Sequence, residues 1–141
     1  MAKATTFAND ILDAAYQNGA SGTFVLGSTT YTLPLKCRFQ STLSTAGAQG
    51  TEFPATGGYT AGGVSLAGLF TAAASAASKS NTGAVTVSNA PAGTWAGIEI
   101  TDSTGTPKRM NFGPGTTLGK TVNSGDTVTL PSSTGITGTE T

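Results

Sequence analysis

The sequence contains no histidine and a single cysteine, so it lacks the residues from which most transition-metal sites and cysteine–histidine nucleophiles are built. One cysteine also cannot form an intramolecular disulfide. Charged residues make up only 10% of the 141 residues, against roughly 25% in an ordinary soluble domain. Seven basic side chains balance seven acidic ones, and they form no positive patch of the kind that contacts nucleic-acid phosphates. We therefore expect no metal, no cofactor and no nucleic-acid partner.

Long apolar runs are missing as well. No stretch approaches the roughly 18 apolar residues that a membrane span needs, and the longest weakly apolar stretch, residues 62–77, is mostly alanine, glycine and serine. Near the N-terminus Asn9, Asp10 and Asp13 interrupt the apolar residues, so no secretory signal is predicted. We expect a chain that is synthesised in the cytoplasm of its host and has no membrane partner.

Small polar residues are abundant instead, with 27 threonines, 13 serines and 20 glycines. The length fits one domain. Residues 1–22 predict a helical arm, because four apolar side chains recur on one helical face: Phe7, Ile11, Leu12 and Ala15. Thr5 or Thr6 can cap the start of this helix, and Asn18-Gly19 is typical of a helix end.

Residues 23–131 predict a β domain. Residues 35–39 alternate apolar and basic side chains, which places Leu35, Cys37 and Phe39 toward the core and the two basic residues toward solvent. Further strands are expected at 23–26, 31–33, 84–87, 95–101, 108–112, 120–122 and 127–130, with turns at 102–105 and 123–126 and a polar tail over 132–141. Regular turn spacing indicates a mainly β fold, a β-sandwich or barrel-like domain with one short N-terminal helix.

Two segments are less regular. Residues 41–63 are rich in serine, threonine, glycine and alanine and read as a long loop with one strand near Phe53; loops of this length are often functional. Residues 64–78 carry apolar side chains at helical spacing, yet Val64-Ser65-Leu66 follows a Gly-Gly break as a strand would. Periodicity alone favours a helix over 64–78.

No residue pattern supports catalysis, and we predict that the chain is not an enzyme. Residues 113–121 suggest a phosphate-binding loop, but the motif needs glycine where Pro114 stands, so a Gly/Pro connection between strands is expected. Asp10 and Asp13 are expected on the solvated face of the helix. Cys37 is expected in the core, and so is Trp95 with its indole N–H hydrogen-bonded. The carboxylates of the turns, at 102 and 126, are expected to bond local backbone amides.

Four stretches taken in order, residues 5–13, 36–39, 50–60 and 88–127, resemble a family of small virion proteins from tailed bacteriophages, particularly phages of actinobacteria. Members are described as head-decoration or tail-fibre-like proteins. The resemblance covers about residues 4–130 and implies a β-sandwich-like module with a leading helix. It also favours a strand followed by an Ala/Ser linker over 64–78, and we favour that alternative.

The resemblance implies a structural role in the virion. We expect a capsid decoration protein that binds the outer surface of the head, contacts the major capsid protein and forms a homo-oligomer such as a trimer. A tail-fibre or tail-tip module for host binding is the alternative, which an exposed Trp95 or exposed tyrosines would favour. The N-terminal helix, the 41–63 loop and the one adjacent basic pair supply the expected docking or subunit contacts: Phe7, Ile11, Leu12, Phe53, Tyr59, Lys108 and Arg109.

Overall fold

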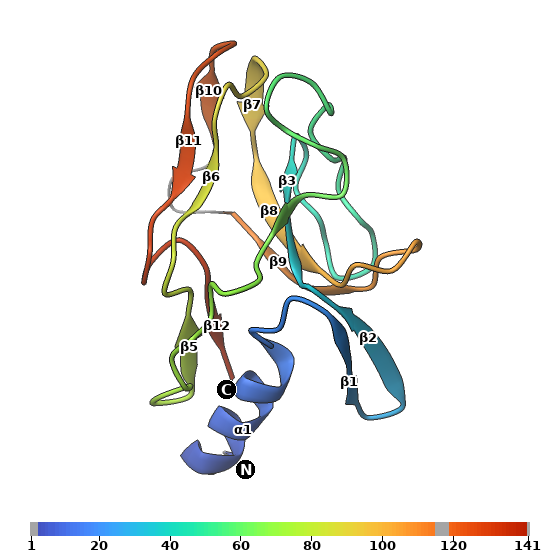
Figure 1. The fold of residues 1–141 in the computed structure, drawn as a ribbon, viewed down its shortest axis with the longest axis vertical. Coiled ribbons are helices and arrows are strands. Elements are labelled where there is room, and N and C mark those ends of the chain that lie inside the picture. The colour runs from blue at the N-terminus through green and yellow to red at the C-terminus, as the bar shows by residue number, and fades with distance from the viewer. Residues whose placement is uncertain (1–2, 115–118, 141) are drawn as a thin grey trace.

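The computed structural model describes residues 3–114 and 119–140 and is mainly β, with one helix near the N-terminus (Figure 1). The fold class predicted from the sequence is confirmed, and the described strands form several sheets without closing into a barrel. The elements in chain order are α1 (Thr5–Ala15), β1 (Gly22–Leu26), β2 (Thr29–Leu33), β3 (Lys36–Gln40), β4 (Val64–Ser65), β5 (Ser78–Ser80), β6 (Val85–Val87), β7 (Gly93–Trp95), β8 (Gly97–Thr101), β9 (Arg109–Gly113), β10 (Lys120–Val122), β11 (Val128–Leu130) and β12 (Thr137–Thr139).

The largest sheet has four antiparallel strands in the order β4-β3-β8-β9. Strands β3 and β8 pair over five residues, from Lys36 opposite Thr101 to Gln40 opposite Gly97. The alternation of β3 places Cys37 and Phe39 in the core with Leu35 just before them, all wholly buried, so this prediction is confirmed.

The remaining strands form two-stranded ribbons. Strands β1 and β2 form a hairpin, β5 pairs with β12, β6 with β11, and β7 with β10. The turn expected at 123–126 lies between β10 and β11, but these strands pair with β7 and β6 and not with each other. The connection from β9 to β10 includes residues 115–118, which lie outside the described residues, as does part of the 113–121 segment discussed above.

The core is built around aromatic side chains. Trp95 is fully buried, with ring centroids 4.4 Å from Phe39, 4.5 Å from Phe53 and 5.7 Å from Tyr59. Edge-to-face and offset arrangements at such distances are the ones that aromatic pairs prefer. This cluster joins the main sheet to the long 41–63 loop, since Phe53 and Tyr59 both come from that loop.

The helix differs from its predicted limits at both ends. Ala4 stands at the N-cap position without a side-chain cap, so Thr5 and Thr6 lie inside the helix. The helix ends at Ala15, before Asn18-Gly19. Burial explains the early end, because Tyr16 leaves the helix and packs with its ring centroid 5.1 Å from that of Phe70.

Residues 64–78 contain the short strand β4 followed by turns, so the strand prediction is confirmed against the helical periodicity. Gly63 has φ 89° and lies against the carbonyl of Cys37, where a side chain would collide. Ala76 and Ala77 have φ 51° and 57°, a left-handed conformation that a helix cannot contain. Leu66 is nonetheless buried, which accounts for the apolar pattern.

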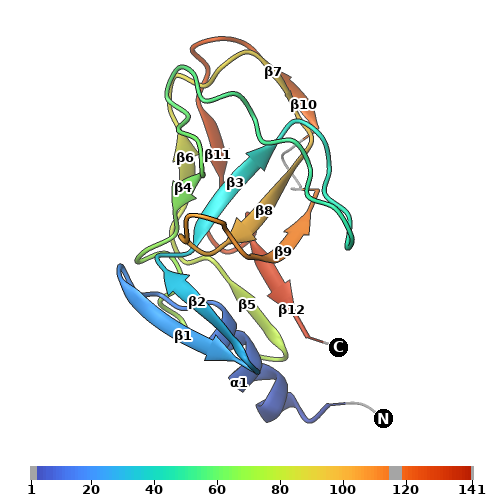
Figure 2. The ribbon, with the colours of Figure 1, turned by 90° about the vertical axis from the view of Figure 1, so that its right-hand side faces the viewer.

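The C-terminal residues take part in the fold. Ile136 is buried, and β12 pairs with β5 from Thr137 opposite Ser80 to Thr139 opposite Ser78. Figure 2 shows β12 beside β5, close to the helix. The segment expected as a polar tail therefore contributes a strand and a core residue.

Candidate functional site

The seven residues expected to dock on a capsid or a neighbouring subunit do not form one surface. On the helix, Phe7 is 58% exposed and Ile11 is partly exposed, but Leu12 is buried in the core. Phe7 is therefore the one helical residue among the three whose side chain is open to a large partner.

Phe53 and Tyr59 are core residues, each only 3% exposed. Phe53 stacks on Trp95, and the Tyr59 hydroxyl accepts a hydrogen bond from the Phe39 N–H at 3.0 Å. Their side chains are thus unavailable as docking contacts, which corrects the expectation from the sequence. The exposed apolar residue of the 41–63 loop is Leu43, at 51%.

The basic pair Lys108 and Arg109 is bonded within the chain. The Lys108 Nζ lies 3.5 Å from Asp102. Arg109 donates to the carbonyls of Ala46 at 2.9 Å and Ala48 at 2.7 Å, and its Nη1 lies 3.5 Å from the Glu99 carboxylate. Arg109 therefore holds the 41–63 loop onto the edge of the main sheet.

A cluster of four charged side chains, Arg38, Glu52, Glu99 and Arg109, covers the outer face of that sheet and is called the charge cluster below. Glu99 on β8 is fully buried, with an arginine nitrogen of Arg38 and of Arg109 each 3.5 Å from its carboxylate. Ser44 Oγ also donates to Glu99, and Gln49 Nε2 donates at 2.9 Å. A buried carboxylate needs several such donors, because removal from water strongly disfavours the charge.

Glu52 links the charge cluster to the aromatic core. Its carboxylate lies 2.6 Å from Arg38 and accepts hydrogen bonds from the Tyr59 hydroxyl at 2.8 Å and the Gly62 N–H at 2.7 Å. Burial alone would raise the pKa of Glu52, but these three donors together hold it below its ordinary value. Burial, and then the neighbouring carboxylate, raise the pKa of Tyr59, which stays a protonated donor.

Asp102 is a second fully buried carboxylate, placed where β8 ends. It accepts the N–H groups of Lys108 at 2.7 Å and Thr32 at 3.1 Å and the hydroxyl of Thr104 at 2.8 Å. Burial favours the protonated form, but the bonds lower the pKa of Asp102 overall. The predicted bonds from turn carboxylates to backbone amides are confirmed here and at Asp126, which accepts the Asn123 N–H at 2.9 Å.

Asp13 is not simply solvated, as the sequence suggested. It accepts the Ala74 N–H at 2.8 Å and pairs with Lys79 at 2.7 Å. The hydrogen bond from Lys79 is the main cause that lowers the pKa of Asp13. One turn earlier, Asn9 accepts the Ala77 N–H at 2.9 Å. The polar face of α1 thus holds the segment that follows β4.

Cys37 and Trp95 are both buried, as predicted. Burial raises the pKa of the Cys37 thiol, which keeps it in its unreactive protonated form. The indole N–H of Trp95 has no hydrogen-bond partner within residues 3–114 and 119–140, so the bond expected for it is not found there.

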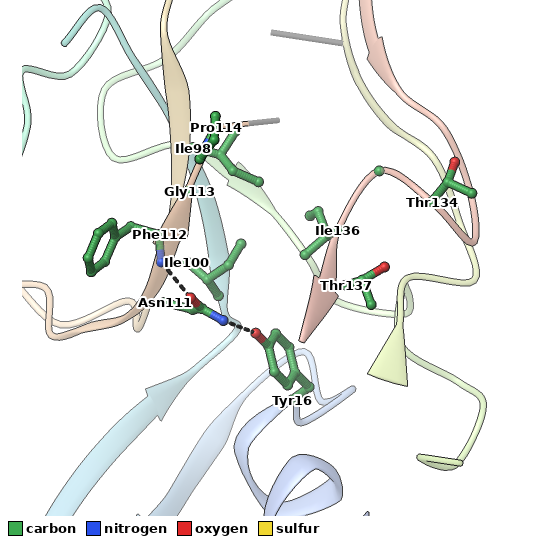
Figure 3. A pocket seen from close by; sticks show the side chains of 11 residues that line it. Tyr16, Ile98, Ile100, Asn111, Phe112, Gly113, Pro114, Thr134, Ile136 and Thr137 are labelled. Atoms are coloured by element: carbon green, nitrogen blue, oxygen red, sulfur yellow. Dashed lines mark hydrogen bonds between the residues drawn. The ribbon is translucent and has the colours of Figure 1, made fainter. Parts of the chain in front are cut away.

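Three cavities are lined in part by residues of β9, β10, β11 and β12 or next to them. A cavity of about 250 Å³ lies between β9 and residues 134–137, with Tyr16, Ile98 and Ile100 in its lining (Figure 3). A second, of about 330 Å³, lies between β10 and β11 with Trp95 in its lining. A third, of about 200 Å³, follows between residues 109–111, residues 138–140 and α1.

The charged and polar side chains described above form hydrogen bonds and ion pairs within their own chain. Within the described ranges no group of three or more His, Cys, Asp or Glu side chains is arranged to hold a metal ion. No helix in those ranges has the length and apolar character to cross a membrane. Sequence reasoning missed the charge cluster, because its members are up to 71 positions apart and only the strand register brings them together.

Comparisons with known proteins give no further assignment. No family model, curated protein or solved structure matches this chain.

Proposed function

We propose that this chain is a non-enzymatic structural protein of a tailed-bacteriophage virion, a decoration protein that binds the outer surface of the head. The resemblance of residues 4–130 to small virion proteins suggests this role. In this proposal the chain contacts the major capsid protein and copies of itself. Binding only to the assembled shell would stabilise that shell by mass action.

One observation carries the proposal: most of the charged side chains pair with each other within the chain. Ten of the fourteen charged side chains take part in intramolecular ion pairs. The charge cluster anchors the 41–63 loop to the main sheet, and short polar side chains are the most abundant polar residues of the chain. Such side chains have little entropy to lose when they pack against a neighbour, and a neutral chain does not repel copies of itself in a dense array.

The exposed apolar residues support a docking role for the two segments expected from the sequence. The large apolar side chains that are most exposed among the described residues are Phe7 on the helix, Leu43 on the 41–63 loop and Val25 on β1. Two of these three lie in the expected docking segments. The alternative, host binding by a tail module, would gain support from an exposed Trp95, and this side chain is buried.

Binding to phage heads assembled without this chain tests the proposal. We expect the purified protein to co-sediment with such heads and to appear on their outer surface by electron microscopy. Phe7→Asp and Leu43→Asp should each weaken binding by at least about tenfold, because a charge replaces an apolar contact. Val25→Asp is the matched control, equally exposed but on the hairpin, and should bind normally. Binding to tails alone, or to neither structure, would contradict the proposal.

A further inference from the structure

The connection between α1 and β1 contains the one Asn-Gly step of the sequence, Asn18-Gly19. Residues 17–19 belong to neither the helix nor a strand, and Asn18 is exposed. An asparagine side chain before glycine can react with the next peptide nitrogen, because glycine has no side chain to obstruct the approach of that nitrogen. Since the helix ends at Ala15, this step does not serve as the helix end that the sequence suggested.

Hydrogen bonds hold the oxygen atoms of Asn18 and leave the two reacting nitrogen atoms free. Its Oδ1 accepts the Phe70 N–H at 3.0 Å, and its main-chain carbonyl accepts the Gly68 N–H at 3.2 Å. Among residues 3–114 and 119–140, neither Asn18 Nδ2 nor the Gly19 N–H donates a hydrogen bond. The nucleophile, which is the Gly19 nitrogen, and the leaving group, which is Asn18 Nδ2, therefore lose no hydrogen bond when they react.

The Phe70 N–H is placed to assist such a reaction. Attack of the Gly19 nitrogen on Cγ of Asn18 moves negative charge onto Oδ1. A backbone donor that already points at this oxygen stabilises the charge, as the donors of an oxyanion hole do. Exposure of Asn18 also gives hydroxide and water access to the reacting atoms.

We propose that Asn18 is a site of spontaneous deamidation, and that its conversion to isoaspartate releases residues 66–78 from the chain that follows α1. Hydroxide removes the Gly19 amide proton, and the nitrogen forms a bond to Cγ. The Cγ–Nδ2 bond then breaks, and the departing nitrogen takes a proton from water and leaves as ammonia. A five-membered succinimide ring remains, and the hydroxide is regenerated.

Water opens the ring in one of two ways. Addition at Cγ breaks the new bond and gives aspartate, whereas addition at the main-chain carbonyl carbon gives isoaspartate. In isoaspartate the chain runs through Cβ and Cγ, so the connection between α1 and β1 is one methylene longer. The former Oδ1 becomes a peptide oxygen, and the former main-chain carbonyl becomes a carboxylate. Both acceptors of the Phe70 and Gly68 N–H groups are therefore displaced. The proposal does not depend on the virion role, because it concerns only the bonds that Asn18 makes.

Incubation of the folded protein at mildly alkaline pH tests the reaction. Peptide mapping by mass spectrometry measures the gain in mass at each asparagine, and an isoaspartyl methyltransferase assay measures isoaspartate. Asn123 is the matched internal control, because it is exposed in a turn and is followed by serine. We expect Asn18 to react at least about tenfold faster than Asn123, because serine carries the side chain that glycine lacks. The folded protein should also react at Asn18 at least as fast as the protein unfolded in urea.

Variants separate the reaction from its consequence. Gly19→Ala should slow deamidation of Asn18 at least about tenfold. Its added methyl group meets only Cδ1 of Leu33, the end of a flexible side chain, and circular dichroism checks that the variant folds. Gly105→Ala is the control and should leave the rate at Asn18 unchanged, because Gly105 is exposed and has open space around it.

Hydrogen exchange measures the release of residues 66–78. In the isoaspartate-containing fraction, amide exchange in this segment should be at least about fivefold faster than in fresh protein. Asn18→Asp keeps an oxygen for the Phe70 N–H, so exchange in this variant should stay within about twofold of the fresh protein.

Several results would overturn the proposal. Equal rates at Asn18 and Asn123 would remove the special reactivity of the Asn-Gly step. A slower reaction in the folded protein than in urea would show that the fold protects Asn18. Unchanged exchange in residues 66–78 of the isoaspartate-containing fraction would show that Asn18 does not hold this segment.

Discussion

Two irregular segments of this chain are held in place by different chemistry. Residues 41–63, the charge-anchored loop, are fixed by the fully buried carboxylate of Glu99, by the half-buried carboxylate of Glu52 and by two arginines. Residues 66–78, the helix-anchored segment, are fixed by acceptors at the edge of α1: Asp13 takes the Ala74 N–H, Asn9 the Ala77 N–H and Asn18 the Phe70 N–H at 3.0 Å.

In both segments, side-chain groups take the place of the backbone hydrogen bonds that a helix or a strand would supply. In the helix-anchored segment, three neutral or partly exposed side-chain acceptors take the backbone N–H groups of Phe70, Ala74 and Ala77, which lie three or four residues apart. The charge-anchored loop instead crosses the outer face of the main sheet and buries ionised groups, so each carboxylate needs several donors. We therefore expect the loss of a single anchoring side chain to lower the free energy of unfolding more in the charge-anchored loop than in the helix-anchored segment.

Glu99→Ala should have the largest effect. It leaves Arg38 and Arg109 facing each other without the carboxylate between them, and breaking a buried ion pair in this way costs about 3–5 kcal/mol of unfolding free energy. Urea unfolding measures the loss, and hydrogen exchange should show faster exchange in residues 41–63 than in 66–78. The control is Glu140→Ala, which removes the surface pair with Lys3 and should cost at most about 1 kcal/mol. Equal effects of the two variants would refute a buried role for Glu99.

Phe53→Ala should have the second-largest effect, a decrease of about 3 kcal/mol in the free energy of unfolding. This variant empties the space above Trp95, and the low end of the usual range applies because the loop can partly close over it. The exchange rates of residues 41–63 should again rise first. Near-ultraviolet circular dichroism should also weaken, since Trp95 loses its stacked neighbour. A fully native spectrum would contradict the packing described for this cluster.

Asp13→Ala should cost less, about 1–2 kcal/mol, because it removes one acceptor and the partner of the buried Lys79 from a position that is 39% exposed, where water can take the place of the carboxylate. Here the faster exchange should be confined to residues 66–78, the opposite of the result for Glu99→Ala. Asp13→Asn keeps an oxygen for the Ala74 N–H and should recover part of the loss. Faster exchange in both segments would contradict the claim that Asp13 anchors residues 66–78 alone.

Mild acid should have the smallest effect. The pKa values of Glu52, Asp102 and Asp13 are all lowered in the folded chain. Each folded carboxyl then binds protons less readily than the unfolded one, so its contribution is complete above the unfolded value and declines as the pH falls through the folded value. With ordinary values of 4.5 for Glu52 and 3.8 for the two aspartates, stability should be flat from neutral pH down to about 5 and should decline below 4.5. Urea unfolding at a series of pH values checks this, and stability that rises on acidification would show that the sign is wrong.

Local pattern predicted much of the fold. The alternation in 35–39 fixed which side chains of β3 enter the core, and the turn residues at 102–105 and 123–126 marked the ends of strands. These features depend on neighbours in sequence, which is why they could be predicted. The helix limits could not, because burial of Tyr16 ended the helix earlier than Asn18-Gly19 indicated.

Contacts between distant residues were beyond sequence reasoning. Phe53 and Tyr59 resembled loop aromatics available for docking, but their burial depends on Trp95, which lies 42 and 36 positions away. The partners of β10 and β11 were likewise hidden, since adjacent strands joined by a short turn usually pair with each other.

The position of Cys37 on the inner face of β3 has a practical consequence. Since the native thiol is shielded, a cysteine introduced at an exposed position becomes the only site in the folded protein for maleimide chemistry. Dyes, spin labels or gold particles can then be attached one per chain without first removing the native residue.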